Sequence, residues 1–231
     1  MIEDRIFTVS EAWKTAYPDA HAGILVMQGV QNPPAHSGLD ELKHALESRL
    51  RAQFAGQDRS ALESGAPIPA YAAYYKQFKK TYPVQAQLES IVFKGKSIPG
   101  VAALVEAMFM AEIKNLLLTA GHDFDKLQLP VRLNVADGTE SYTLLRGQEQ
   151  VLKAGDMCMS DQAGVISSIV YGPDQRTQIN AGTRAVMFAV YAPAGVETSA
   201  LQAHLEDIRD YVLVVAPGAE VQMLQIFGSA S

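Results

Sequence analysis

The stretch Val105 to Leu127, VEAMFMAEIKNLLLTAGHDFDKL, marks the point where the sequence changes from a helical pattern to a strand pattern. Its first part belongs to a predicted long helix from about Val101 to Leu118. Beyond Gly121 the chain consists of short apolar runs separated by turn residues. Helices in the first half and strands in the second favour an α+β domain over a repeating βαβ sheet.

Before this point, one strand and several helices are predicted. Ser10 is the expected N-cap of a short helix through Trp13 to Tyr17, and Gly23 to Met27 is a buried strand. A second helix opens at Ser37, and its predicted apolar face is Leu39, Leu42, Leu46 and Leu50.

A further helix begins at Pro67 and Pro69, and a short one lies around Leu88 to Val92. The first of these carries one aromatic stripe, formed by Tyr71, Tyr74, Tyr75 and Phe78. Its lysines point elsewhere, either to solvent or toward phosphate groups.

After Gly121, turn signals such as Asp137-Gly138 and Gly172-Pro173 separate the predicted strands. A helix from Ser199 to about Asp210 is expected near the end. The predicted strands are Leu129 to Val135, Ser141 to Leu145, Gln150 to Leu152, Asp156 to Met159, Val165 to Tyr171, Ala185 to Tyr191, Tyr211 to Val215 and Glu220 to Phe227.

Length and composition exclude several classes of protein. The chain has 231 residues, 48% hydrophobic and 19% charged, which suits one globular domain with an elaboration. We expect the main domain at residues 1–195 and a helix-strand extension packed on it at residues 196–231. No apolar run approaches the ~18 residues of a membrane helix. The acidic start, Met1 to Arg5, lacks the features of a signal peptide, so we expect a soluble, cytoplasmic protein.

The sequence gives no sign of a metal or an organic cofactor. A single cysteine, Cys158, excludes an internal disulfide and a multi-cysteine zinc site, and its apolar neighbours favour a buried thiol. The chain has no phosphate-binding loop, no dinucleotide glycine pattern and no nucleophile elbow. We therefore predict no cofactor.

Charge is distributed unevenly along the chain, whose net charge is −6. From Tyr71 to Gly100 there are five lysines and one acid, a net charge of +4, whereas Glu197 to Ser231 carries −4. Such asymmetry is compatible with one surface that receives phosphates. The candidate RNA-binding residues are Lys76, Lys79, Lys80, Lys94 and Lys96.

Two polar clusters are candidates for chemistry. His122 and Asp123 follow Gly121 and are either an acid–base or metal site or, the interpretation that we favour, a loop. Asp174, Arg176 and Thr177 lie between two strands and form either a network at the mouth of a pocket or a tie within a hairpin connection.

The order of several motifs resembles that of the B3/B4 domain of the phenylalanyl-tRNA synthetase β subunit, and more closely the freestanding B3/B4 proteins. The helix from Val105-Glu106 leads to Asp123-Phe124-Asp125-Lys126-Leu127 at the spacing of that domain. The other matches, in order, are the helix Tyr71 to Lys80, the turn Phe93 to Lys96, Ala154-Gly155-Asp156, Asp174 to Thr177 and Gly182 to Phe188. The resemblance spans roughly Phe7 to Pro193.

The resemblance implies a β-sandwich-like core and a link to tRNA. In the synthetase, this domain hydrolyses tyrosine wrongly attached to the phenylalanine tRNA, using a positioned water. The present chain departs from it at the pocket. Met108-Phe109 replace a Thr-Asn pair, Ala120 stands where a His is expected, and Ala189 lies near the tyrosine-reading Glu. His122 substitutes for the lost His only if a two-residue gap is allowed, so the synthetase's tyrosine specificity is not expected here.

Two functions follow from this resemblance. The first is a trans-acting aminoacyl-tRNA deacylase of altered specificity, whose partner is tRNA or aminoacyl-tRNA. Its water-positioning candidates are Asp174, Arg176, Thr177, Ser167 and Ser168. The second is a module that keeps the fold and binds RNA or a small ligand without catalysis, which the lost Thr-Asn, His and Glu favour. A structural role as the partner of a synthetase or another protein is a third.

Overall fold

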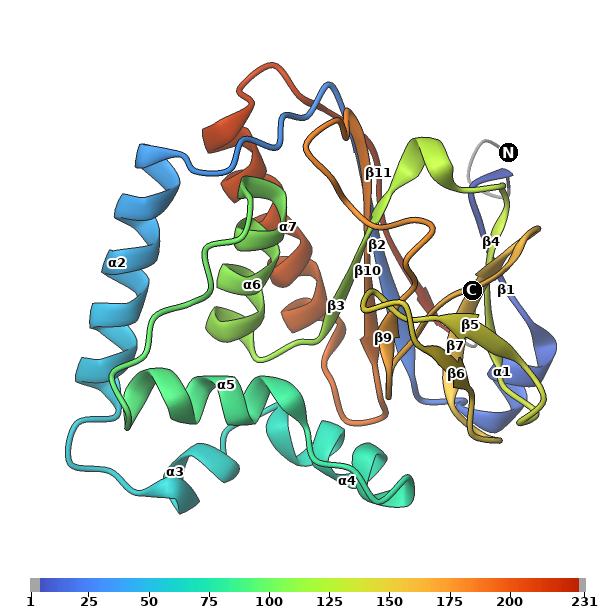
Figure 1. The fold of residues 1–231 in the computed structure, drawn as a ribbon. Coiled ribbons are helices and arrows are strands. Elements are labelled where there is room, and N and C mark those ends of the chain that lie inside the picture. Colours follow the sequence, from blue (N-terminus) through green and yellow to red (C-terminus); the bar gives the residue numbers. More distant parts are fainter. Residues whose placement is uncertain (1–4, 229–231) are drawn as a thin grey trace.

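The computed structural model describes residues 5–228 and contains two facing sheets with most of the helices on one side (Figure 1). The four-stranded sheet has the order β11-β2-β10-β3, and the five-stranded sheet has the order β1-β4-β7-β8-β9. The strands are β1 (Phe7–Val9), β2 (His21–Gln28), β3 (Thr119–Asp123), β4 (Val131–Val135), β5 (Ser141–Thr143), β6 (Glu149–Val151), β7 (Met157–Asp161), β8 (Gly164–Ser168), β9 (Gly172–Pro173), β10 (Ala185–Ala192) and β11 (Glu220–Gly228). Strands β5 and β6 form a separate hairpin.

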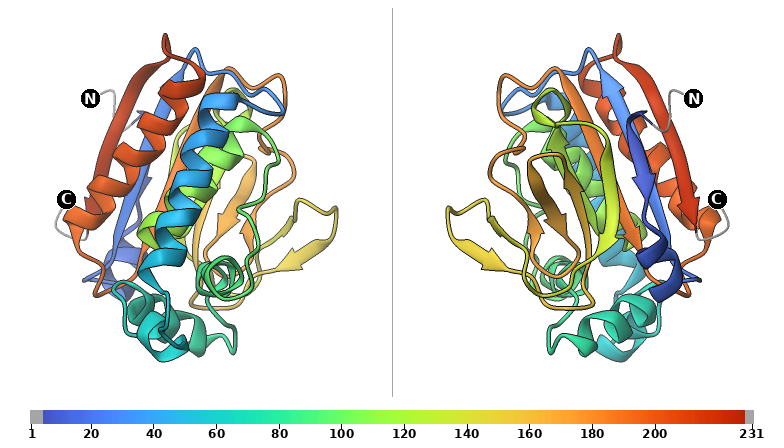
Figure 2. Two further views of the ribbon diagram at one scale, coloured as in Figure 1. Left: turned by 90° about the vertical axis from the view of Figure 1, so that its left-hand side faces the viewer. Right: turned by 90° about the vertical axis from the view of Figure 1, so that its right-hand side faces the viewer.

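Helices cover the outer face of the four-stranded sheet and close one end of the molecule. The helices are α1 (Glu11–Ala16), α2 (Ser37–Gln53), α3 (Arg59–Glu63), α4 (Ile68–Gln77), α5 (Pro83–Val92), α6 (Ala103–Asn115), the short 3₁₀ helix η2 (Phe124–Lys126) and α7 (Thr198–Val215). Helices α6 and α7 lie against the sheet, and α2 packs outside them (Figure 2). The predicted α+β class and β-sandwich-like core are confirmed.

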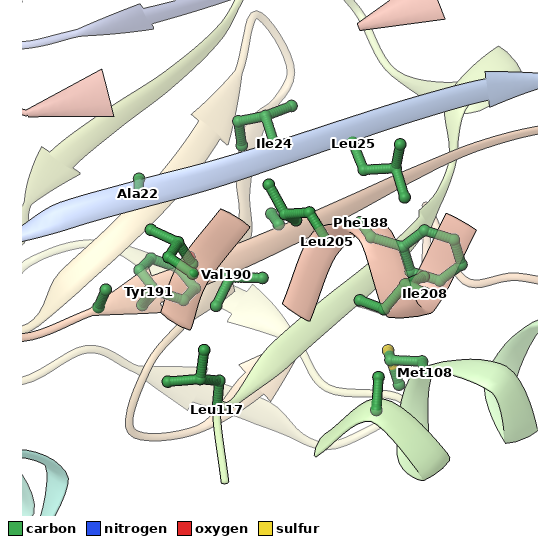
Figure 3. Close-up of a cluster of buried hydrophobic side chains, with 14 of the residues drawn as sticks. Ala22, Ile24, Leu25, Met108, Leu117, Phe188, Val190, Tyr191, Leu205 and Ile208 are labelled. Carbon is green, nitrogen blue, oxygen red and sulfur yellow. The ribbon is translucent and has the colours of Figure 1, made fainter. Parts of the chain in front are cut away.

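Strands β2 and β10 are buried on both faces, which explains their nearly continuous apolar sequences. One face meets α7, where Leu205 and Ile208 lie beside Phe188 and Val190 (Figure 3). On the other face, the rings of Phe7 and Phe227 have centroids 4.7 Å apart and link β1 to β11. Strand β11 pairs with β2 through a bulge between Val221 and Met223.

Helix α4 joins the ends of both sheets through its tyrosine hydroxyls. The Tyr71 hydroxyl donates to the carbonyl of Tyr191 at 2.5 Å, and the Tyr75 hydroxyl donates to the carbonyl of Ile169. The Tyr74 hydroxyl donates to Asp156 Oδ1 at 2.8 Å and accepts the amide N–H of Met157 at 2.7 Å. The predicted aromatic stripe is thus confirmed as buried, and its hydroxyls find partners in β7, in β10 and just after β8.

Most predicted elements are present, with shifted ends. Ser10 caps α1 by accepting the N–H of Trp13 at 3.1 Å, as predicted. Helix α6 stops at Asn115, short of Leu118, because Leu116 adopts a left-handed conformation with φ of 59°. Helix α5 starts earlier than predicted, at Pro83. In α2, Leu42 belongs to the predicted apolar face but is 40% exposed and lies outside the buried face of the helix.

Two sequence-based assignments are wrong. His122 and Asp123 belong to strand β3, not to a loop, because pairing with β10 outweighs the weak local signal. Tyr211 to Val215 is the last turn of α7, not a strand. Its buried residues, Val212 and Val215, continue the spacing set by Ile208, so the apolar run has a helical period. Elements β1, α3 and β9 were not predicted.

Two further expectations concern the thiol and the membrane. Cys158 is buried in β7, as predicted, and burial raises the pKa of its thiol to about 12. Across residues 5–228, no helix combines the length and apolarity needed to cross a bilayer. The start of the chain, on which the signal-peptide argument depended, lies mostly outside the described residues.

Replacing Tyr74 with Phe should lower the free energy of unfolding by about 2 kcal/mol. The substitution leaves the buried Asp156 carboxyl and Met157 N–H without this partner, and an unpaired buried polar group costs about 1–3 kcal/mol. Chemical denaturation of both proteins measures the difference. Tyr171→Phe is the matched control, since it removes a hydroxyl from a half-buried ring, and it should stay within about 0.5 kcal/mol of the wild type. Equal losses in both variants would contradict this role for Tyr74.

Candidate functional site

A cavity of about 440 Å³ lies where α6, the edge strand β3 and the β8–β9 region meet. Most of its wall is apolar. The apolar lining residues are Val101, Val105, Met108, Phe109, Leu118, Ala120, Leu145, Pro173 and Ile179, with Gly121 and Gly172. The polar lining residues are Gln87, Glu112, Thr119, Ser168, Gln178 and Tyr191. A mainly apolar wall with a few polar groups is typical of a small-molecule site.

Helix α6 provides one wall through residues that share a face. Val105, Met108, Phe109 and Glu112 are spaced three, one and three residues apart, so their side chains point the same way. Opposite them, Gly121 leaves room for the cavity. A Cβ atom there would lie 2.8 Å from Ile179 Cδ1 and 3.3 Å from Met108 Sδ.

Glu112 supplies the carboxyl group of this wall. Its side chain is buried, and its Oε1 accepts the amide N–H of Thr119 at 2.7 Å. Burial disfavours the charged form and raises the pKa of the carboxyl to about 8, against a smaller lowering by the Thr119 hydrogen bond. At neutral pH the carboxyl therefore carries a proton.

The other polar groups of the wall are held in place by buried partners. The Tyr191 hydroxyl lies 2.7 Å from Ser167 Oγ, and Ser168 Oγ accepts the N–H of Tyr171 at 3.0 Å. Thr119 Oγ1 lies 2.7 Å from Nε2 of His204. Burial lowers the pKa of His204 to about 3, so this imidazole is neutral. The cavity thus offers oriented hydroxyl groups beside a protonated carboxyl.

A second polar cluster lies outside the cavity wall. The Thr177 hydroxyl donates to Asp174 Oδ1, so His122 Nδ1, 2.7 Å from Thr177 Oγ1, carries the hydrogen in their contact. Burial lowers the pKa of His122 to about 3, with a further lowering by Arg176. Arg176 forms two hydrogen bonds to Asp161, at 2.8 and 3.0 Å. This network ties the connection between β9 and β10 to β3 and to the end of β7.

The structure places the predicted pocket residues in two environments. Met108, Phe109 and Ala120 line the cavity, whereas His122 and Ala189 are buried elsewhere in the four-stranded sheet. Of the five water-positioning candidates, Ser168 lines the cavity, and Ser167 contacts it indirectly through Tyr191. The remaining candidates, Asp174, Arg176 and Thr177, belong to the network described above.

All five candidate RNA-binding lysines are exposed. Lys94 and Lys96 lie in the segment that leads from α5 to Val101, an exposed residue of the cavity wall. Lys80 Nζ lies 5.5 Å from the ring centroid of Tyr171, which precedes the lining residue Gly172. Lys76 and Lys79 are at the end of α4 and just after it. Positive charge therefore lies in two chain segments, of which one leads to Val101 of the cavity wall and the other contacts Tyr171, the residue before Gly172.

Glu112, Thr119 and Tyr191 are not among the site residues predicted from the sequence. One signal was available for Glu112, because it follows the selected Met108 by four residues on a predicted helix and so shares its face. Thr119 and Tyr191 reach the cavity through tertiary structure alone. Among residues 5–228, no three His, Cys, Asp or Glu side chains come together in a way that would hold a metal ion.

The fold and the site define an α+β domain with a largely apolar cavity at the edge of a sheet. The sequence matches the B3/4 domain over residues 69–211, and the chain belongs to this family. The resemblance inferred from the order of the motifs is thereby confirmed. Every residue that lines the cavity falls within the matched region.

The fold is also similar to that of an N-terminal fragment of the phenylalanyl-tRNA synthetase β subunit from Pyrococcus horikoshii. The TM-score is 0.51 at 13% sequence identity, and the match covers 95% of this chain. It covers 50% of the synthetase fragment, so this chain spans about half the length of that fragment. No curated protein matches the sequence.

The pH dependence of stability should reveal the protonated Glu112. Since burial raises its pKa from 4.5 to about 8, the folded protein retains a proton that the unfolded chain releases above pH 4.5. The free energy of unfolding should therefore fall between these pH values, by on the order of 5 kcal/mol from this group. Glu112→Gln, which keeps an acceptor for the Thr119 N–H, should remove that part of the slope in denaturation series.

Glu197→Gln is the control, because Glu197 is exposed and lies outside the cavity wall. Its slope should equal that of the wild type. A slope for Glu112→Gln that also equals the wild type would show that Glu112 ionises normally in the folded protein.

Proposed function

We propose that this chain is a tRNA-linked protein, and that it acts in trans as an aminoacyl-tRNA deacylase. The cavity receives the aminoacyl end of a charged tRNA, and the ester is hydrolysed by a bound water. The proposal draws on the B3/4 family and on the similarity to part of a tRNA synthetase. Neither fixes an activity by itself, because one fold hosts many functions.

The observation that carries the proposal is the cavity. Its volume, about 440 Å³, lies within the range of sites that enclose small ligands. Met108, Phe109 and Ile179 offer apolar surface, whereas Glu112, Thr119 and Ser168 offer polar groups. Such a site suits an aminoacyl ester whose side chain is apolar. An apolar substrate also agrees with the absence of the synthetase's Thr-Asn and Glu from the matching positions.

Ester hydrolysis requires a positioned water and hydrogen-bond donors for the oxygen that becomes negative. The Ser168 hydroxyl is the sequence-derived candidate that can contact an ester in the cavity. The Thr119 hydroxyl is a further polar group in the wall, whereas the Tyr191 hydroxyl already donates to the carbonyl of Ser167 at 3.2 Å. Further positioning would come from the terminal adenosine of the tRNA, as the resemblance to the synthetase domain implies.

A non-catalytic binding module is the second candidate. One observation favours it: Asp174, Arg176 and Thr177 contact one another, Asp161 and His122, and do not line the cavity. With Glu112 protonated at neutral pH, the wall contains no carboxylate ready to accept a proton from water. Binding without turnover separates this candidate from the deacylase.

Purified protein should release amino acid from tRNA charged with one or a few apolar residues faster than the spontaneous rate. The measurement is a deacylation screen of bulk tRNA charged with each amino acid in turn, including tyrosine. Val105→Phe, which fills the cavity from α6, should reduce the release at least about tenfold. Val221→Phe makes the same change at an exposed site away from the cavity and should leave release unchanged. Spontaneous rates with every tRNA would exclude the deacylase and leave the binding module.

Retention of tRNA should weaken with salt, because lysines near the cavity would replace counterions on phosphates. Lys94→Glu combined with Lys96→Glu should reduce the slope of log affinity against log salt by about 1 to 2. Filter binding over a salt series measures the slope. Arg209→Glu, in the acidic C-terminal segment, serves as the control and should change the slope little. An unchanged slope in the double variant would exclude these lysines from the RNA contact.

A further inference from the structure

Three glutamates are buried in residues 5–228, and they differ in one respect. Glu106 Oε1 lies 2.6 Å from Lys43 Nζ, and Glu47 Oε2 lies 3.2 Å from a guanidinium nitrogen of Arg51. Glu112 has no such partner: within residues 5–228, no Lys, Arg or His forms an ion pair with its carboxyl. The unpaired member of the set is the one that lines the cavity.

The groups around Glu112 do not supply the missing charge. The hydroxyls of Tyr71 and Tyr82 donate to backbone carbonyls, those of Tyr191 and Leu116. The Tyr75 hydroxyl donates to Ile169. The hydroxyl of Thr119 contacts neutral His204. Lys114, two residues further along α6, is paired with Asp207 at 2.6 Å.

A buried carboxyl without a cation is costly to ionise, and a buried pair is far more favourable than a single charge. A cationic group of a ligand would therefore supply Glu112 with the ion pair that Lys43 and Arg51 provide to the other two glutamates. The thioether of Met108 and the ring of Phe109 lie on the same helix face, so the rest of such a ligand would contact apolar surface. This combination fits a primary amine attached to a compact apolar body.

We propose that Glu112 is a specificity-determining residue that binds the ammonium group of the cavity's ligand. On binding, the Glu112 carboxyl releases its proton to solvent, and the carboxylate accepts hydrogen bonds from the ammonium through the oxygen not engaged by Thr119. The apolar body occupies the space between α6 and Ile179. This inference deepens the proposed function and rests on it for one point, that the amine is the α-amino group of an aminoacyl ester. In that setting, Glu112 distinguishes aminoacyl esters from other esters.

The test uses two pairs of amides that an esterase leaves intact and that differ only in the α-amino group: phenylalaninamide with 3-phenylpropanamide, and leucinamide with 4-methylpentanamide. Binding is measured by calorimetry or by NMR titration. In at least one pair, the wild type should bind the member with the amine about tenfold to a hundredfold more tightly than the member without it. This is the gain in affinity expected from a hydrogen bond to a charged group. Glu112→Gln should bind both members equally, with unchanged affinity for the amide that lacks the amine.

Glu197→Gln, an exposed acid outside the cavity wall, should keep the wild-type preference, and thermal unfolding checks that each variant is folded. The inference is overturned if the wild type binds both members of each pair alike or binds none of them. It is also overturned if folded Glu112→Gln keeps the preference for the amine. Selective amine binding without deacylation would leave the inference standing and reject the deacylase. Deacylation without a role for Glu112 in amine binding would support the deacylase and reject the inference.

Discussion

Three tyrosine hydroxyls on α4 fix the positions of the two sheets relative to each other, and the site depends on this constraint. They reach the carbonyl of Tyr191 in β10, the carboxyl of Asp156 beside β7 and the carbonyl of Ile169 after β8. Each contact joins residues 82 to 120 positions apart in the sequence. The ends of β8 and β10 are thereby fixed, and with them Ser168 and Tyr191, which line the cavity.

The cavity exists because β3 is an edge strand that is covered without being packed tightly. Helix α6 lies over one side, and the β8–β9 region approaches the other. A side chain at Gly121 would meet the ends of the Ile179 and Met108 side chains, which would have to shift to make room for it. The helix ends at Asn115, and the next residues bring Thr119 back to Glu112, so one short turn of chain positions both a carboxyl and a hydroxyl in the wall.

Local patterns in the sequence predicted the elements whose apolar residues follow one period, such as α2, α4 and β10, and the order of motifs gave the family. Patterns failed where tertiary pairing decides the outcome. His122 has polar neighbours typical of a loop, yet β10 makes it part of a strand. Met108, Phe109 and Ala120 could be assigned to a pocket by analogy. Tyr191 could not, since its role depends on which strands are neighbours. For Asp174, sequence spacing did not decide between a network at the mouth of a pocket and a tie within a hairpin connection.

The ends of the sheets have a consequence for how the protein behaves at high concentration. A regular, exposed edge strand can recruit the strand of another molecule and start aggregation. The five-stranded sheet ends in β1, with three residues, and β9, with two residues that include Pro173. The outer strand β11 is interrupted by its bulge near Val221, and such bulges disturb the ladder that a second chain would extend. These three edge strands thus discourage polymerisation, even though the cores of both sheets are strongly apolar.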